Sequence, residues 1–285
     1  MLTNYSAYKD LYLKCFTDDT EQDAVFLFET VLKKAERVCE YENGTPIAML
    51  FLMDCRVQTK TESLPFYYLY AACTHPDHRG KGLMSKLLEK AKQKSLADGK
   101  MGIFLKPATP SLFDFYAKSG FEPFFKYTKI SCSAKQFLSN IEIKKAIAPI
   151  TQMTLKEWQM RRYEPLGLLT DIYADFEGDL FYSAAAGCTS VFAGGAAIVY
   201  ELRGDTLLVK EAFCRKGNEK ALLSLTGAVL LMLRRENIEL RLPAVYSDDA
   251  FVGLDPKTDY FSVIWHNDNL NLSDYEAPYH GFAFD

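Results

Sequence analysis

A basic, glycine-containing segment from Thr74 to Met84 has the residue types and spacing that most directly predict chemistry. It follows an apolar stretch typical of a strand and precedes a stretch with the periodicity of an amphipathic helix. The N-terminus of a helix presents unpaired backbone N–H groups and the positive end of the helix dipole, so the segment is a candidate anion site. Gly80 and Gly82 let the backbone approach a phosphate, and Arg79 and Lys81 add positive charge. The alternative is a tight surface turn that only caps the helix.

The spacing of this segment argues against two common phosphate-binding loops. It matches neither G-x-x-x-x-G-K-[ST], the loop of nucleoside triphosphatases, nor G-x-G-x-x-G, the loop of dinucleotide-binding domains. A second motif follows downstream, where Phe115 to Phe121 reads F-Y-A-K-S-G-F. The two motifs together are more specific than a glycine loop alone.

Together these motifs resemble the GCN5-related N-acetyltransferase (GNAT) family. Residues Arg79 to Leu83 match the family's pyrophosphate loop, [QR]-x-x-G-x-[GA], whereas Met84 stands where the family usually has Gly or Ala. The side chain of Met84 either crowds the phosphates or points from the helix into the sheet. The segment Phe115 to Phe121 resembles the family's F-Y-x-[KR]-x-G-F signature. The resemblance covers residues 1–130 and implies the mixed-sheet α/β fold of the acyl-CoA N-acyltransferases.

By this resemblance, acetyl-CoA is the co-substrate, and the acceptor is a primary amine of a small molecule or peptide. The backbone at the end of the third strand is expected to bind the pantetheine amides, and the loop amides are expected to bind the pyrophosphate. The residues implied for these contacts are Cys73, Thr74, His75, Arg79, Gly80, Lys81, Gly82, Leu83 and Met84. Tyr116 is implied as the general acid that meets the departing thiolate. The alternative for Tyr116 is an aromatic ring packed beside neighbouring phenylalanines.

The general base is less clearly indicated. Many family members carry a Glu on the strand before the loop, but Phe66 to Thr74 contains no carboxylate. Some multidomain members insert a C-terminal carboxylate into the active site, which makes Asp285 a candidate base. The alternative, which we favour, is that the aromatic segment Tyr275 to Asp285 only covers apolar surface.

Helix and strand signals alternate through the first half of the chain. Helices are expected at Asn4–Phe16, Thr20–Lys34, after Gly82 and at Ser111–Lys118, and strands at Arg37–Glu42, Pro46–Val57, Phe66–Thr74, Met101–Leu105 and Phe121–Ile130. Thr20 and Asp23 are typical of a capped helix start, and Asn43-Gly44 is typical of a hairpin turn. This alternation predicts an α/β unit with helices packed on a sheet.

The second half is predicted to repeat this order. Strands are expected at Ala196–Leu202, Thr206–Cys214 and Ile238–Leu242, with an apolar helix at Ala221–Arg235. We therefore expect a tandem duplication: a catalytic domain at 1–134, a linker at 135–153 and a degenerate copy at 154–285. The alternative is that hairpin-helix-strand is simply a common α/β order.

The degenerate copy is expected to form one wall of the acceptor cleft. Its loop, Cys214 to Lys220, has one glycine and places Glu219 where an anion would bind. Four acidic residues are candidates to attract a cationic amine, although a solvated acidic face is the favoured alternative. These residues are Asp171, Asp175, Glu177 and Asp179.

The composition of this 285-residue chain argues against several classes of binding partner. The excess of 37 acidic over 33 basic residues gives a net charge of −4, which argues against nucleic-acid binding. Seven cysteines without C-x-x-C pairs and without a secretory leader predict reduced thiols in the cytoplasm. No apolar stretch is long enough for a membrane span, and the four histidines lack metal-ligand spacing. The oligomeric state, homo-oligomer included, stays open.

Two other functions fit the same residues. A non-catalytic acyl-CoA binder or sensor fits Met84 and the missing strand carboxylate. Peptide-bond formation on an aminoacyl or thiol precursor also occurs in tandem members of the superfamily that the chain resembles. The sequence alone does not select the acceptor.

Overall fold

The computed structural model describes residues 5–141, 149–176, 183–246, 251–273, 275 and 278–281. The first half forms α1 Ser6–Cys15, α2 Glu21–Phe26, a π-helical turn η1 Leu27–Val31, β1 Glu36–Glu42, β2 Thr45–Thr59, β3 Ser63–Thr74, a 3₁₀ turn η2 Pro76–His78, α3 Leu83–Ala97, β4 Gly102–Leu105, α4 Ser111–Ala117 and β5 Glu122–Ser133. As predicted, Thr20 caps α2: the Asp23 N–H donates to Thr20 Oγ1 at 3.3 Å, and the Thr20 N–H donates to Asp23 Oδ2 at 2.8 Å. Asn43 and Gly44, both with positive φ, form the predicted turn between β1 and β2.

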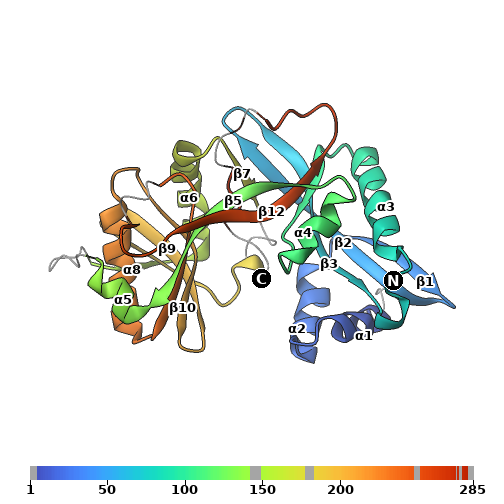
Figure 1. The fold of residues 1–285 in the computed structure, drawn as a ribbon, viewed down its shortest axis with the longest axis horizontal. Helices are drawn as coiled ribbons and strands as arrows, with labels where there is room; N and C mark the ends of the chain where they lie inside the picture. Colours follow the sequence, from blue (N-terminus) through green and yellow to red (C-terminus); the bar gives the residue numbers. More distant parts are fainter. Residues whose placement is uncertain are drawn as a thin grey trace.

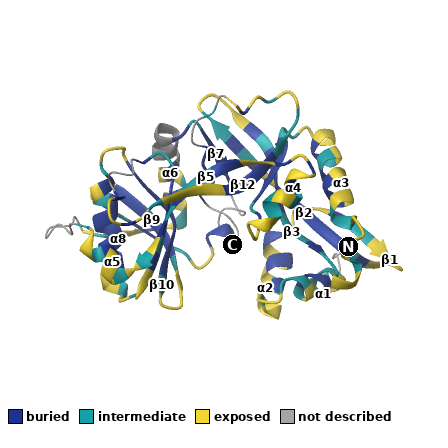
Figure 2. Ribbon diagram, in the orientation of Figure 1, coloured by how far each residue is buried: buried dark blue, intermediate teal, exposed yellow. Residues whose placement is uncertain are grey.

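Helices cover both faces of the strands in this half. α3 and α4 pack on one face, where Leu87, Leu88 and Tyr116 join Leu50 and Ile103 in a buried cluster. α1 and η1 pack on the other face, where their side chains meet the opposite side of β2 and β3. Figure 2 shows the outer surface of α3 as largely exposed, in agreement with its amphipathic sequence.

The second half repeats the strand order of the first. Its elements are α5 Ala134–Ser139, β6 Thr151–Met153, α6 Leu155–Leu169, β7 Ile172–Asp175, β8 Thr189–Ala193, β9 Ala196–Arg203, β10 Thr206–Cys214, α8 Glu219–Leu233, β11 Asn237–Leu242 and β12 Lys257–His266. β9 and β10 are antiparallel, and α8 connects β10 to the parallel strand β11, just as α3 connects β3 to the parallel strand β4. Among the described helices, none is both long and apolar enough to cross a membrane.

Two long strands join the halves into one mixed sheet. The strand order is β1-β2-β3-β4-β12-β5-β11-β10-β9-β8-β6, and β7 pairs with β2 outside this path. β12 comes from the second half but lies between β4 and β5, whereas β5 comes from the first half and pairs with β11. Figure 1 shows β5 and β12 running side by side across the middle of the molecule. Each half therefore completes its sheet with a strand from the other.

This exchange bears on the predicted division at 135–153. That stretch contains all but the first residue of the helix α5 and the whole strand β6, so its described part is not an extended linker. A cut there would also separate β12 from β4, its partner in the sheet. The division of the chain into 1–134 and 154–285 stays a prediction, and the hydrogen bonds of the sheet cross it.

The C-terminal segment 278–281 lies between β5 and β7. Tyr279 forms parallel bridges to Lys126 of β5 and to Tyr173 of β7. Its N–H donates to Ile172 O at 3.0 Å, and its carbonyl accepts from the Ala174 N–H at 2.8 Å. Because β7 pairs with β2, this segment closes the strands β2, β3, β4, β12, β5 and β7 into a ring.

A buried ion network lies beside this segment. Arg162 of α6 bonds Glu211 of β10 through Nε and Nη2, at 3.0 and 2.7 Å, and Asp175 of β7 through Nη1 at 2.7 Å. Trp158 donates its indole N–H to Glu211 at 3.0 Å, and all four side chains are buried. A Cβ at Gly281 would lie 2.0 Å from the Tyr279 hydroxyl and 2.6 Å from Glu211 Oε1, so only glycine fits there.

Replacement of the buried arginine is expected to destabilise the fold strongly. Arg162→Leu leaves two carboxylates buried without their cation, which we expect to lower the free energy of unfolding by about 3 to 5 kcal/mol. Urea unfolding followed by circular dichroism measures this change. Arg203→Leu, which removes the exposed partner of Glu201, is the control and should cost about 1 kcal/mol or less. Equal losses in the two variants would contradict the role given to the network.

Candidate functional site

The parallel strands β3 and β4 separate after three paired residues. Phe66, Tyr67 and Tyr68 pair with Gly102, Ile103 and Phe104, and beyond Tyr68 no described strand pairs with β3 on its β4 side. β3 continues to Thr74 along β2, while β4 continues along β12. We call the resulting opening, between Leu69–Thr74 of β3 and the end of β4, the fork.

A bulge in β3 lies inside the fork. The register between β2 and β3 shifts between Met49 and Phe51, and Ala71, at this shift, has a φ of +51°. A positive φ at a residue with a Cβ costs about 1 kcal/mol or more, and such strain concentrates at functional sites. The bulge changes the direction of the last residues of β3 before the loop.

The loop after β3 ends in a row of backbone donors. Gly80 and Gly82 have φ of +75° and +73°, and nothing lies within 4 Å of a Cβ built on either residue. These glycines are therefore required by the backbone conformation and not by lack of space. The first intrahelical bond of α3 runs from the Lys86 N–H to Gly82 O at 3.1 Å. Within the described chain, the N–H groups from Gly80 to Ser85 have no protein acceptor, which makes this a ready anion site.

Met84 lies at the start of α3 with its side chain against the sheet. It packs with the buried cluster that α3 forms with β2 and β4. Of the two alternatives for this residue, the structure shows the second, in which the side chain points into the sheet. Its backbone N–H remains among the unpaired donors.

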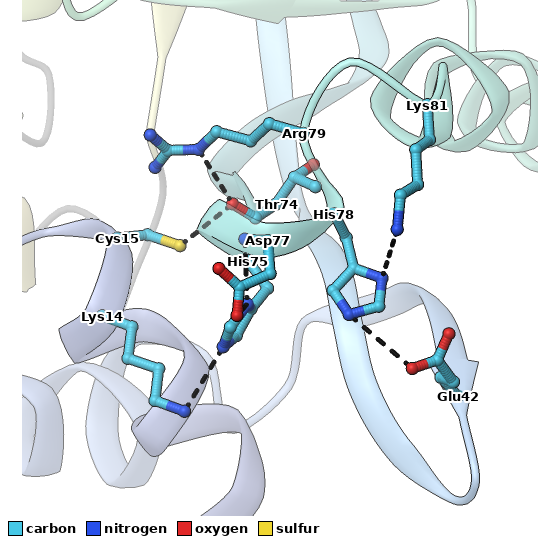
Figure 3. A network of polar contacts seen from close by, with 9 residues as sticks. All are labelled: Lys14, Cys15, Glu42, Thr74, His75, Asp77, His78, Arg79 and Lys81. Carbon is cyan, nitrogen blue, oxygen red and sulfur yellow. Dashed lines mark hydrogen bonds and ion pairs between the residues drawn. The ribbon is translucent and has the colours of Figure 1, made fainter.

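A network of polar side chains surrounds Thr74 and His75 (Figure 3). The carbonyl of Thr74 accepts from Arg79 Nε at 3.2 Å and from the Cys15 thiol at 3.4 Å. His75 Nδ1 accepts from the Asp77 N–H at 3.3 Å, and its Nε2 lies 3.4 Å from Lys14 Nζ. The network therefore fixes the turn by which β3 enters the loop.

The three backbone contacts implied for pantetheine are not equally placed. The His75 N–H donates to Ile47 O at 2.8 Å, and its carbonyl accepts from the His78 N–H at 2.9 Å, so both groups have protein partners. Alternate residues of a strand direct their backbone N–H and carbonyl groups to opposite edges. The backbone groups of Cys73 therefore face β2, as those of His75 do. Thr74 alone of the three directs its N–H and carbonyl away from β2, and because its carbonyl already accepts from Arg79 and Cys15, its N–H is the group that faces the fork without an acceptor among the described residues.

Cys15, at the end of α1, is a site residue that the sequence did not indicate. Its pKa is lowered to about 7, first by a hydrogen bond with the Cys73 thiol and then by the nearby Arg79 guanidinium, against the effect of burial. The pKa of Cys73 is raised by the same hydrogen bond and by burial. A half-buried thiol with substantial thiolate character at neutral pH thus lies beside the fork.

Tyr116 lies in α4 on the face of the sheet that α3 covers. Its side chain is 6% exposed, and its ring meets Phe115 and Phe121 edge-on, with centroids 5.3 and 5.8 Å away. Burial raises its pKa to about 12, so the phenol keeps its proton at neutral pH. Gly120, with a φ of +79°, ends the helix, and the N–H groups of Ser119 and Phe121 bond to the Tyr116 carbonyl.

The counterpart loop in the second half lacks the row of free donors. The carboxylate of Glu219, at the first turn of α8, accepts from the Gly217 N–H at 2.9 Å. Glu219 is 7% exposed, so this buried carboxylate accepts from a loop N–H group, whereas the corresponding N–H groups before α3 have no acceptor in the described chain. An internal negative charge at this helix start disfavours the binding of a phosphate there.

The two described members of the predicted acidic cluster, Asp171 and Asp175, do not share a surface. Asp175 is buried against Arg162, and Asp171 pairs with Lys60. Glu177, Asp179 and the candidate base Asp285 lie outside the described residues. Among the described residues, no group of His, Cys, Asp or Glu side chains is arranged to hold a metal ion.

Comparison with a protein-family model identifies the first half. Residues 2–124 match the model described as Acetyltransferase (GNAT) domain. This region belongs to the GNAT family. The matched GNAT region contains the fork, the loop before α3 and Tyr116. None of the curated proteins matches this sequence.

Solved structures share the fold over nearly the whole chain. A probable N-acyltransferase from Enterococcus faecalis V583 has a TM-score of 0.74 and 12% identity, covering 91% of this chain and 69% of that one. A GCN5-related N-acetyltransferase from Kribbella flavida has a TM-score of 0.70 and 15% identity, covering 94% and 69%. One from Anabaena variabilis has a TM-score of 0.71 and 14% identity, covering 93% and 70%. The likeness extends the GNAT fold beyond residue 124.

The lowered pKa of Cys15 predicts selective alkylation. Only the thiolate reacts with iodoacetamide, so the labelling rate of Cys15 should rise through pH 7 and level off above pH 8. Cys39, also half-buried but with a pKa raised to about 11 by burial, is the internal control and should label slowly throughout this range. Mass spectrometry of timed digests measures both rates. Parallel pH profiles for the two cysteines would contradict the assignment.

Proposed function

We propose that this protein transfers the acetyl group of acetyl-CoA directly to a primary amine of a small molecule or peptide. The observation that carries the proposal is the row of N–H groups without protein acceptors from Gly80 to Ser85, directly beside the fork, in a GNAT domain. The free thiols fit a reducing compartment, and we propose the cytoplasm.

The loop and the fork suit the two ends of the cofactor. The N–H groups and the dipole of α3 would bind the pyrophosphate, with Arg79 and Lys81 nearby and both exposed. Charge-assisted hydrogen bonds contribute about 1.5 to 3 kcal/mol each, so several of them give firm binding. The N–H of Thr74 would then donate to a pantetheine carbonyl within the fork, whereas the Thr74 carbonyl already accepts from Arg79 and Cys15.

Tyr116 is proposed as the general acid. When the amine nitrogen attacks the thioester carbonyl and the carbon–sulfur bond breaks, the CoA thiolate leaves with a negative charge. A phenol that stays protonated can stabilise this charge by a hydrogen bond before it gives up its proton. Because its pKa is raised to about 12, the Tyr116 phenol is protonated at neutral pH and can donate a hydrogen bond to the leaving thiolate.

The acceptor must reach the thioester as a neutral amine. For an amine with a pKa of about 10.4, deprotonation at pH 7 costs about 4.6 kcal/mol, but for an α-amine near 7.8 it costs only about 1 kcal/mol. β3 carries no carboxylate to accept this proton. The proposed base is Asp285, because the described residues just before it, Tyr279 to Gly281, are anchored beside the catalytic strands.

The second half is proposed as a degenerate copy that forms a wall of the acceptor cleft. Its loop already holds the Glu219 carboxylate, which supports one acetyl-CoA per chain. The second candidate function is a non-catalytic acyl-CoA binder, favoured by the absence of a carboxylate from β3. The packing of Met84 against the sheet weakens the other reason for that alternative.

A Tyr116→Phe variant distinguishes the enzyme from the binder. Loss of the phenol proton is expected to lower kcat about 100-fold, whereas the Kd for acetyl-CoA stays unchanged. CoA release, measured against polyamines, amino acids and peptides with free N-termini, gives kcat, and calorimetry gives Kd and stoichiometry. Tyr67→Phe is the matched control, since Tyr67 lies in the same buried cluster but donates its hydroxyl to Asp98 at the far end of α3. Acetyl-CoA binding without turnover in the unaltered protein would favour the binder.

Deletion of Phe282 to Asp285 tests the proposed base. If the terminal carboxylates accept the amine proton, kcat/KM should fall about 100-fold, with the largest loss below the pKa of the amine. Asp285→Asn removes the side-chain carboxylate and keeps the main-chain one, so the pair of variants separates the two groups. Unchanged kcat/KM in a folded deletion variant would eliminate the C-terminal base and leave the segment a cover for apolar surface.

A further inference from the structure

His280 lies at the centre of the ring of strands. It is 1% exposed, and its imidazole is surrounded by aromatic rings from β3, β4, β5, β12 and the residue after β7. The centroids of these rings lie 5.2 to 5.8 Å from that of His280, and they belong to Tyr68, Phe104, Phe125, Phe176 and Phe261. One side chain from the C-terminal segment therefore contacts all four central strands of the ring.

Two of these contacts fall at the base of the fork. Tyr68 and Phe104 are the last paired residues of β3 and β4 before the strands separate. The His280 ring lies at interplanar angles of 76° to the Tyr68 ring and 86° to the Phe104 ring. It therefore packs edge-to-face against the two residues at which the fork opens. A change in its position would change the separation of β3 and β4.

A hydrogen bond fixes the orientation of the imidazole. His280 Nδ1 lies 2.6 Å from Ser262 Oγ, and both side chains are buried. Ser262 is in β12, at an irregularity of its pairing with β5. The bond thus ties the C-terminal segment to the strand that supports β4 on the other side of the fork.

The backbone of the same segment is anchored independently. The Lys126 N–H donates to Pro278 O at 2.8 Å, and Tyr279 bonds to both Ile172 and Ala174. These bonds hold the segment between β5 and β7 without any contribution from the imidazole. Loss of the bond between His280 and Ser262 should therefore reorient the ring while leaving the segment in place.

We infer that His280 is a positioning residue for the acyl-CoA cleft: oriented by Ser262, its ring sets the opening of the fork between β3 and β4. The inference rests on the proposed function, since it assumes that pantetheine enters the fork. It assigns the segment 278–281 a task in cofactor binding, separate from the carboxylates of Asp285. Loss of the bond between His280 and Ser262 is therefore predicted to weaken the binding of acetyl-CoA with little change in the rate of the chemical step.

The test uses two variants that remove the same hydrogen bond from opposite sides. His280→Phe keeps an aromatic ring but cannot bond Ser262, and Ser262→Ala removes the partner with a smaller change. Each is expected to raise the Kd and the KM for acetyl-CoA about tenfold while leaving kcat at saturation within about twofold. The double variant should be no worse than either single one, because all three lack the same bond. His280→Asn keeps a polar atom near the position of Nδ1 but loses the ring contacts with Tyr68 and Phe104, so it should also raise the Kd for acetyl-CoA.

Ser190→Ala is the matched control. Ser190 is also buried, and its hydroxyl donates to Met153 O at 2.8 Å in the second half, away from the fork. It should lower the thermal midpoint as Ser262→Ala does but leave the Kd for acetyl-CoA unchanged. Equal Kd values in Ser262→Ala and the unaltered protein, or an equal loss in Ser190→Ala, would overturn the inference. If the unaltered protein does not bind acetyl-CoA, the proposed function fails instead.

If His280→Phe does not fold, the smaller variant Ser262→Ala decides the question. Its affinity for acetyl-CoA, measured by calorimetry at a temperature where circular dichroism shows a native spectrum, is then compared with that of Ser190→Ala. A tenfold difference supports the positioning role, and no difference refutes it.

Discussion

Backbone pairing of β12 with β4 and β5 is the constraint on which the candidate site depends. β4 has only four residues, and three of them pair with β3 before the two strands separate. Without β12 on its other edge, β4 would be too short and too weakly bonded to hold one side of an open fork. The separation that makes room for a ligand is therefore stabilised by a strand from the second half of the chain. The reciprocal pairing of β5 with β11 gives the second half the same support.

Local signals in the sequence predict the elements well. The cap at Thr20, the turn at Asn43-Gly44 and the apolar stripe of α3 each depend on residues a few positions apart, and each is confirmed by the structure. Long-range pairing is different. Nothing in Lys257–His266 specifies that this strand lies between β4 and β5, because its partners are brought to it by the fold of the whole chain. A boundary drawn from composition at 135–153 could not anticipate strands that cross it.

The candidate site likewise combines features that local sequence predicts with features that depend on long-range pairing. The spacing of Arg79, Gly80 and Gly82 predicts a loop at a helix N-terminus, and the positive φ of both glycines explains their presence. Which backbone groups of the preceding strand are available could not be predicted, because that depends on the pairing of His75 with Ile47. Cys15 lies 3.4 Å from the Thr74 carbonyl only because α1 packs on β3, and a lone cysteine carries no sequence signal for such a contact.

The exchanged strand also dictates the order in which this protein can be made. During synthesis the N-terminal half leaves the ribosome long before residues 257–266, so its sheet must wait with β4 and β5 unpaired along the edges that β12 will fill. Exposed strand edges of this kind attract other strands, including those of neighbouring chains. Folding is then governed by contacts between residues far apart in sequence, which makes it slow. Until β12 has been synthesised, the edges of β4 and β5 that it will cover stay open to pairing with other chains, so this fold depends on protection from aggregation during synthesis.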